Sequence, residues 1–241
     1  MTNKTYKKAL CMLLMIAVIS GNAGVPGNPV VAIAAGISGP ATSATGVTGV
    51  VAVDFGRAAV VAEKMYYCGE LYIFTESMMK TNFEMATIAA NLKDQLGSTR
   101  VSVSNSILNN IVAQYNTLSD KYNSWVEVRP NLEKNIGIID NSRVYNVHQL
   151  QLVYRNTLTT INLTRALLEL VSGSIEDASS VSKTEIEKSI DTAVKRAAGA
   201  NRIIEPYLAR SLSGYRSYFD EFSKLAGIQY DDDDNDDDGE S

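Results

Sequence analysis

The sequence predicts an all-α fold, an elongated bundle of four to five helices with one very long N-terminal helix. Over most of residues 54–227, apolar residues recur at spacings of three and four, the period of a helix face. Residues that begin or end helices, such as Asp54 and Gly97, flank these stretches. The alternating pattern of a half-buried strand is almost absent. We therefore expect one helical bundle domain at 54–227.

Residues 1–23 are typical of a cleavable secretory signal peptide. Three lysines precede an apolar run, Ala9–Ser20, and the small residues Gly21 and Ala23 follow it. The run is about a dozen residues long, whereas a helix that spans a bilayer needs about 20, so a permanent membrane anchor is the weaker alternative. We expect an exported protein that works in the periplasm, at the cell surface or outside the cell.

Residues 24–53 form a Gly-, Ala- and Val-rich segment in which no helical or strand period persists. The simpler interpretation is a flexible leader. The alternative is a segment that becomes ordered against a partner or a membrane surface, because its ends, Val30–Ile33 and Val50–Val53, are costly to leave exposed in large patches. The sequence leaves both interpretations open.

A long helix is predicted to begin after Asp54, whose carboxylate can accept hydrogen bonds from the unpaired amides of a first helical turn. The apolar spacing continues until Gly97, a helix-ending residue. The span is about 40 residues, or roughly 60 Å at the rise of an α-helix. The expected apolar face contains Val61, Met65, Cys68, Tyr72, Met79, Phe83, Ala86 and Ala90.

A second helix is predicted over Ser104–Trp125. The pair Arg129-Pro130 ends it or follows closely, because proline disfavours a helical residue before it. The loop to Asn141 carries an apolar patch at Ile136–Ile139, which we expect to cover one end of the bundle. The inner face of the helix is expected to contain Ile107, Ile111, Tyr115, Leu118, Tyr122 and Trp125.

A third helix is predicted over Arg143–Val171, with Gly173 closing it. Its apolar residues occupy heptad-like positions of the kind found in coiled coils, and Thr157 and Thr164 lie in the same seam. The seam contains Val147, Leu150, Tyr154, Ile161, Leu168 and Val171.

The last helical stretch is predicted to begin at a capping box, Ser182-Lys183-Thr184-Glu185, in which the serine and the glutamate each satisfy one amide. Pro206 removes a backbone donor and clashes with the preceding turn, so we expect a kink or a short break there. The stretch ends near Leu225. Its inner face is expected to contain Ile186, Ile190, Ala193 and Ala197 before the proline, and Leu208, Leu212, Tyr215, Phe219 and Phe222 after it.

Residues 228–241 form an acidic tail with seven Asp and one Glu. The chain carries a net charge of −5, so removing the eight acidic charges of the tail leaves +3, and removing the three lysines of the signal segment leaves a neutral body. A neutral body lacks the basic surface of a nucleic-acid-binding protein, and we expect no nucleic-acid partner.

The tail also resembles part of a calcium site. Asp234, Asp236, Asp238 and Gly239 match the start of an EF-hand loop, but the bidentate Glu of the twelfth position is missing before Ser241. We expect a disordered, solubilising segment, with weak divalent-cation binding or docking to a basic partner as the minority alternative.

No catalytic, cofactor-binding or metal-ligating residues are predicted, and we expect the protein not to be an enzyme. His148, the one histidine, has no nucleophile paired with it and is expected to be solvated or at the edge of the core. The common nucleophile-elbow, zinc-protease and phosphate-loop motifs are missing. Of the two cysteines, Cys11 lies in the signal segment, so we expect no intramolecular disulfide and a buried Cys68.

Tyrosine and methionine residues on the first helix are adaptable contact residues, and most are expected to lie in the core. Those left exposed, together with Tyr215–Phe222, form a candidate partner-binding surface. The residues of the first helix are Tyr66, Tyr67, Tyr72, Met78, Met79 and Met85.

The order of these segments resembles the minor pilus subunits and periplasmic assembly proteins of conjugative type IV secretion systems, especially the helical conjugal-transfer proteins of Bacteroides-type elements. A signal peptide and a short apolar run ending in Asp, Val50–Asp54, precede the long helix. A leucine-rich stretch at Leu167–Val171, the helix start at Ser182–Glu185 and the aromatic helix at Tyr215–Phe222 follow. The resemblance implies a structural role in a transfer channel or pilus tip, with protein partners and no catalysis.

These observations lead to two hypotheses of different classes. The first is an exported, non-enzymatic helical component of a conjugative or type IV secretion apparatus that binds other apparatus or pilus proteins and uses no cofactor. The second is a secreted helical pore-forming or membrane-active toxin in which residues 24–53 contact or enter a bilayer.

Overall fold

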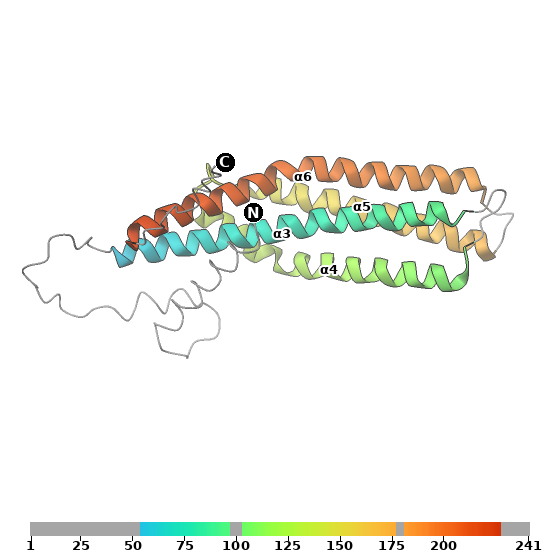
Figure 1. Cartoon of the computed structure of the whole chain (residues 1–241), viewed down its shortest axis with the longest axis horizontal. Coiled ribbons are helices and arrows are strands. Elements are labelled where there is room, and N and C mark those ends of the chain that lie inside the picture. The colour runs from blue at the N-terminus through green and yellow to red at the C-terminus, as the bar shows by residue number, and fades with distance from the viewer. Residues whose placement is uncertain (1–53, 97–102, 177–180, 228–241) are drawn as a thin grey trace, which may run out of the picture. The chain divides into compact units, whose positions relative to one another are not determined.

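The computed structural model describes residues 54–96, 103–176 and 181–227 (Figure 1). The predicted all-α fold is confirmed for this part of the chain. The signal peptide predicted at 1–23, the leader at 24–53 and the tail at 228–241 lie outside the described residues. The described part contains four helices, α3 (Phe55–Asp94), α4 (Asn105–Ile138), α5 (Val147–Glu176) and α6 (Lys183–Leu225).

The chain divides into two compact units, and both α3 and α6 contribute to each of them. The larger unit is Tyr66–Arg216, and the smaller unit takes the residues before and after it.

In the smaller unit, the first turns of α3 and the last turns of α6 form an antiparallel pair. Arg57 forms a 3.3 Å ion pair with Glu221, and the ammonium of Lys64 lies 6.0 Å from the ring centroid of Tyr218. The apolar side chains buried in this unit are Ala58, Val61, Met65, Tyr218 and Phe222. Most of the stabilisation of this pair therefore comes from that apolar seam, because exposed ion pairs contribute little.

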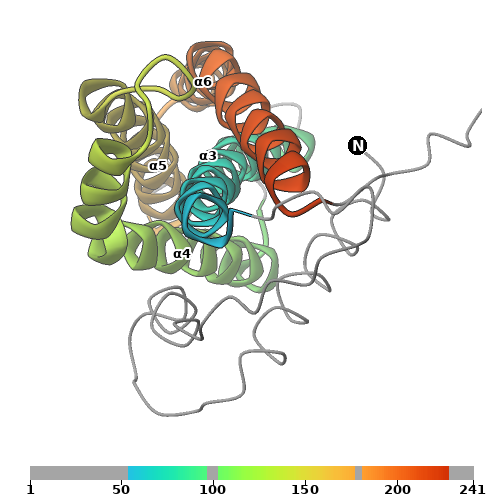
Figure 2. The same ribbon diagram turned by 90° about the vertical axis from the view of Figure 1, so that its left-hand side faces the viewer.

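In the larger unit, α3 is the central helix and contacts each of the other three. Its Ser77 accepts a hydrogen bond from the Trp125 indole of α4, and its Asn82 contacts Thr157 of α5 and Asn201 of α6. Figure 2 shows α3 between α4 and the orange part of α6, with α5 to the left of α3. A helix with neighbours on three sides buries most of its circumference.

Three of the four predicted helix starts, those of α3, α4 and α6, are confirmed at their caps. The Asp54 carboxylate accepts a hydrogen bond from the amide of Arg57 at 3.1 Å, and the Ser104 hydroxyl accepts one from the amide of Ile107 at 3.3 Å. The capping box of α6 is also formed, with Ser182 and Glu185 each accepting from the backbone amide of the other.

The predicted end of α4 near Trp125 is wrong, because the helix passes through Pro130 and ends at Ile138. A proline inside a helix costs about 3 kcal/mol. The turns after it bury Leu132 and Ile136, and each fully buried side chain of this type contributes about 1.5–3 kcal/mol. The apolar patch predicted for a loop is therefore mostly helix, with Ile136 buried and Ile138 partly exposed.

The short break considered at Pro206 and the helix end predicted at Gly173 do not occur. α6 is helical throughout Lys183–Leu225, with the fully buried Ile204 and Ser211 near the proline, and the alternative of a kink at Pro206 stays a prediction. α5 continues past Gly173 to Glu176, where the buried hydroxyl of Ser174 donates to the carbonyl of Val171 at 2.7 Å. Packing on both sides of each helix breaker outweighs the local preference for a break.

The predicted start of α5 at Arg143 is wrong by four residues. Residues 139–146 form the α4–α5 loop, and α5 begins at Val147, where Asn146 and Gln149 exchange side chain to backbone hydrogen bonds of 2.8 and 3.0 Å. The predicted seam of this helix is confirmed except at Val147, which is only partly buried. Its buried residues include Leu150, Tyr154, Thr157, Ile161, Thr164, Leu168 and Val171.

The predicted apolar face of α3 is correct only in its first half. Val61, Met65 and Cys68 are buried, but Phe83 and Ala90 are exposed. Instead, the buried positions keep one seven-residue repeat along the helix, and polar residues occupy part of it. The positions of the repeat are Cys68, Thr75, Asn82 and Ala89, with Leu71, Met78, Met85 and Leu92 three residues after them.

Candidate functional site

The α4–α5 loop of the larger unit packs into the bundle through Tyr145, which is fully buried. The Thr75 hydroxyl donates to the carbonyl of Leu71 at 2.6 Å, so the Tyr145 hydroxyl donates to Thr75 across 2.8 Å. The Tyr145 ring contacts that of Tyr207 on α6, with centroids 5.5 Å apart. Burial raises the pKa of Tyr145 above that of a free phenol. One side chain thus joins the loop to α3 and α6.

Two glycines lie where α6 faces the α4–α5 loop and α3. A Cβ atom added to Gly214 of α6 lies 2.6 Å from the carbonyl oxygen of Arg143, so no larger residue fits without displacing the loop backbone. A Cβ atom added to Gly69 of α3 would lie 3.6 Å from the ring of Tyr215, which is ordinary van der Waals contact. Glycine is therefore required only at position 214, where the backbone of the loop approaches α6 closely.

Cys68 lies against this contact, as the sequence predicts for a buried thiol. It is fully buried, and its sulfur is 3.3 Å from a Cβ placed on Gly214. Burial raises the pKa of the thiol to about 12. The thiolate required of a cysteine nucleophile is therefore strongly disfavoured here.

A buried polar layer crosses the middle of the larger unit. The Asn82 amide donates to Thr157 at 3.3 Å and to Asn201 at 3.0 Å, and Arg196 donates to Asn156 at 3.0 Å. Three buried polar atoms near this layer have no hydrogen-bond partner within the described residues, namely Thr81 Oγ1, Asn82 Oδ1 and Arg196 Nε. Such layers favour one helix register over others, at a cost in stability.

The titratable side chains that a catalytic or metal site would need do not lie together in the described residues. His148 is exposed on the first turn of α5, and Glu187 pairs with Lys183 at 3.6 Å on the first turns of α6. Among the described residues, no group of three His, Cys, Asp or Glu side chains is arranged to hold a metal ion. Within the same residues, no helix combines the length and apolar composition that a membrane span requires.

The predicted contact residues divide between core and surface. Met78 and Met85 are fully buried, whereas Tyr66 remains partly exposed and donates to Glu70 at 2.8 Å. Tyr218 and Phe222 are buried in the smaller unit. The largest exposed apolar side chain lies elsewhere, at Phe83.

A groove runs between α3 and α4 in the larger unit, formed by two adjoining hollows of about 390 and 450 Å³ that share Gln114. We call it the α3–α4 groove. Its α3 side is lined by Phe83, Glu84, Thr87, Ile88, Asn91, Asp94 and Gln95, and its α4 side by Ser106, Ile107, Asn110, Ile111, Gln114, Thr117 and Leu118.

The groove is apolar at one end and acidic along its α3 side. Phe83 is 69% exposed, and Ile88 and Leu118 lie below it. Glu84 and Asp94 form no ion pair with any described residue, and none of the described residues lining the groove is Lys or Arg. An exposed aromatic ring beside unpaired charge is typical of a protein-binding surface.

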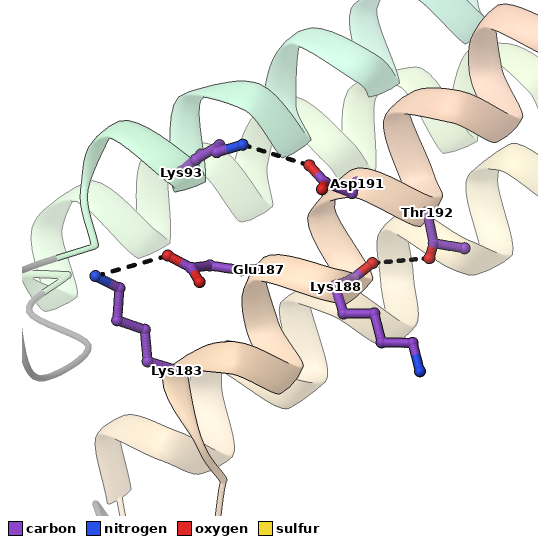
Figure 3. A network of polar contacts seen from close by, with 6 residues as sticks. All are labelled: Lys93, Lys183, Glu187, Lys188, Asp191 and Thr192. Carbon is purple, nitrogen blue, oxygen red and sulfur yellow. Dashed lines mark hydrogen bonds and ion pairs between the residues drawn. The ribbon is translucent and has the colours of Figure 1, made fainter.

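The solvent-facing side of α6 carries a row of cations that we call the α6 basic face. Lys188, Lys195 and Arg202 recur every seven residues, and Arg210 and Arg216 continue the row. All five are exposed, and none forms an ion pair with a described residue. Figure 3 shows the Lys188 side chain pointing away from the ion pairs Lys93–Asp191 and Lys183–Glu187 nearby.

Sequence reasoning missed both surfaces. Phe83 was expected in the core because it is apolar, although the seven-residue repeat through Leu71, Met78 and Met85 places it outside. The body between the signal segment and the tail has no net charge, which gives no sign of the α6 basic face. The seven-residue spacing of its cations is nevertheless visible in the sequence. Comparison with known proteins finds no matching family model, no similar curated protein and no similar solved structure.

Proposed function

We propose that this chain is an exported, non-enzymatic helical component of a conjugative or type IV secretion apparatus, and that it acts by binding protein through the α3–α4 groove. The observation that carries the binding role is Phe83, which is mostly exposed above Ile88 and Leu118 instead of lying in the core. A large exposed aromatic residue over an apolar hollow favours a partner that covers it.

The remaining observations fit a protein that binds rather than reacts. The buried thiol of Cys68 is held protonated, and His148 is exposed with no hydrogen bond to another described residue. The polar layer at Asn82 lies inside the larger unit and away from the groove lining. Among the described residues of the larger unit, unpaired charge and exposed apolar surface lie on helix faces, where a second protein can reach them.

Export and the link to a secretion apparatus rest on the sequence pattern. The signal-like segment 1–23 supports export, and the order of segments from Val50 to Leu225 supports the apparatus. We also propose that the protein is an elongated bundle with one very long N-terminal helix, which is α3.

A photo-crosslinking residue at position 83 tests the binding role in cells that carry the apparatus. The matched control carries the crosslinker at Leu158, an exposed apolar residue of α5 outside the groove. We expect specific protein adducts from position 83 and few from position 158. Because Phe83 is exposed, its replacement should change the free energy of unfolding by less than about 0.5 kcal/mol, so a loss of adducts would not reflect unfolding.

Equal adducts from positions 83 and 158 would contradict the groove as a binding surface. Adducts only to proteins unrelated to secretion would contradict the apparatus. Leakage of liposomes that requires residues 24–53 would favour the membrane-active alternative instead.

A further inference from the structure

Two surfaces of the larger unit complement each other in charge and in apolar character, and we propose that the α6 basic face of one copy of this chain docks in the α3–α4 groove of a second copy. This inference rests on the proposed function, because it names the partner of the same groove. Among the described residues, the carboxylates of the groove and the cations of the α6 basic face form no ion pairs.

The spacing of the charges supports this match. Glu84 and Asp94 are ten residues apart on α3, which is about 15 Å along a helix. Arg202 and Arg210 are eight residues apart on α6, or about 12 Å. The difference is within the reach of two flexible arginine side chains, so one helix laid along the other brings both carboxylates to a guanidinium.

Each of the two surfaces also has an exposed apolar residue next to one of these charged residues. Phe83 precedes Glu84 on α3, and Ile203, which is 41% exposed, follows Arg202 on α6. Packing of Phe83 against Ile203 would remove apolar surface from water on both copies, and the flanking charges would fix the register.

The contact is heterologous, because it joins two different surfaces. Figures 1 and 2 show α4 and the part of α6 up to Arg216 on opposite sides of α3. One pair of copies therefore leaves one groove and one basic face free, and further copies add to those free surfaces. Contacts of this kind produce rings or open chains rather than two-fold dimers.

Two other partners have suitable charge, and the test must separate them. The acidic residues 231–240 of another copy could occupy the α6 basic face, and a basic segment of a different protein could occupy the groove. Only docking between copies requires Glu84 with Asp94 and Arg202 with Arg210 in the same contact.

Charge reversal provides that test on the full chain. One variant carries Glu84→Lys and Asp94→Lys, and the other carries Arg202→Glu and Arg210→Glu. All four residues are exposed, so both variants should keep the helical signal and melting behaviour of the parent. Sedimentation velocity is recorded for the parent, for each variant and for an equal mixture of the two.

We expect the parent to associate at about 0.02 M salt, and its apparent dissociation constant to rise at least tenfold at about 0.5 M salt, where charges are screened. Each variant alone should associate at least about tenfold more weakly, because like charges then face each other. The mixture should recover association, since each basic surface then meets an acidic one.

Three results would overturn the inference. The first is a parent that stays monomeric up to about 1 mM, a concentration that corresponds to roughly −4 kcal/mol of association. The second is association that survives the groove reversal but not the α6 reversal, as expected if the acidic tail is the partner. The third is a mixture that associates no better than its components. A monomeric parent with specific adducts from position 83 would reject docking between copies and leave the proposed function standing.

Discussion

The two sides of α3 in the larger unit differ in how they are packed. Toward α6 and the α4–α5 loop, Gly214 lets the loop backbone approach α6 closely, and Tyr145 of the loop is fully buried. Toward α4, the helix instead borders the α3–α4 groove, with Phe83 mostly exposed. The same helix thus has a closely packed side and an open side.

This difference indicates a division of roles along one helix. The closely packed side contains fully buried groups whose hydrogen bonds are made within the fold, such as the Thr75 and Tyr145 hydroxyls. The open side contains charge and apolar surface that are unpaired among the described residues. Substitutions on the first side should change stability, and substitutions on the second should change binding.

The largest expected effect is at Gly214. In Gly214→Ala the new Cβ would lie 2.6 Å from the Arg143 carbonyl, so the loop must move, and overpacking of this kind costs about 1–3 kcal/mol. Gly199→Ala on the same helix is the matched control. It meets nothing within 4 Å and should stabilise the protein by about 0.5–1 kcal/mol through helix propensity. Urea unfolding measures both, and equal midpoints for the two variants would contradict the close packing.

The second prediction compares two buried threonines of α3 whose hydroxyl groups differ in their hydrogen-bond partners. Thr75→Val leaves the buried Tyr145 hydroxyl without its acceptor and should cost about 1–3 kcal/mol. Thr81 is equally buried, but its hydroxyl has no partner among the described residues. Thr81→Val should therefore be neutral or stabilising by up to about 1 kcal/mol. The two variants are compared by their free energies of unfolding. A loss of stability in Thr81→Val as large as that in Thr75→Val would refute this account.

The smallest expected effect concerns the pH dependence at Cys68. Its pKa is raised to about 12 by burial, whereas an unfolded cysteine has a pKa of about 8.5. Between these values the unfolded chain releases the thiol proton and the folded chain keeps it, so stability falls as pH rises above about 8.5. From pH 7 to about pH 9.5 the expected loss is about 1 kcal/mol.

Cys68→Ala is the control for this prediction. The substitution lowers stability at both pH values, but the part of the pH-dependent loss that comes from the thiol should disappear. Urea unfolding of both proteins at the two pH values measures the difference. Identical pH-dependent losses in the two proteins would show that the thiol is not the titrating group.

Helix type and most helix starts were predictable because their causes are local. Asp54, Ser104 and the Ser182–Glu185 box bond to amides within three residues, so their roles are visible in a short stretch of sequence. The inner face of the first half of α6 was also predictable. Its residues Ile186, Ile190, Ala193 and Ala197 are all buried, since amphipathic spacing alone specifies them.

The continuation of α4 through Pro130 and of α5 past Gly173 was not predictable in the same way. A local rule weighs only the lost backbone bond or the added flexibility, whereas burial of Leu132 and Ile136 after the proline depends on helices far away in sequence. The error on α3 has a related cause. The predicted face contains apolar residues only, whereas the polar Asn82 is fully buried and hydrogen-bonded to Thr157 and Asn201.

The sequence by itself determined that the chain is helical, where most helices begin, and that Cys68 is buried, because periodicity and capping act over a few residues. Only the tertiary structure decided that α3 is central to the larger unit, that Asn82 is inside and Phe83 outside, and that α6 presents its cations on one exposed face. The reason is that these properties depend on which elements are neighbours. The surfaces proposed here for binding follow from that arrangement and not from any local motif.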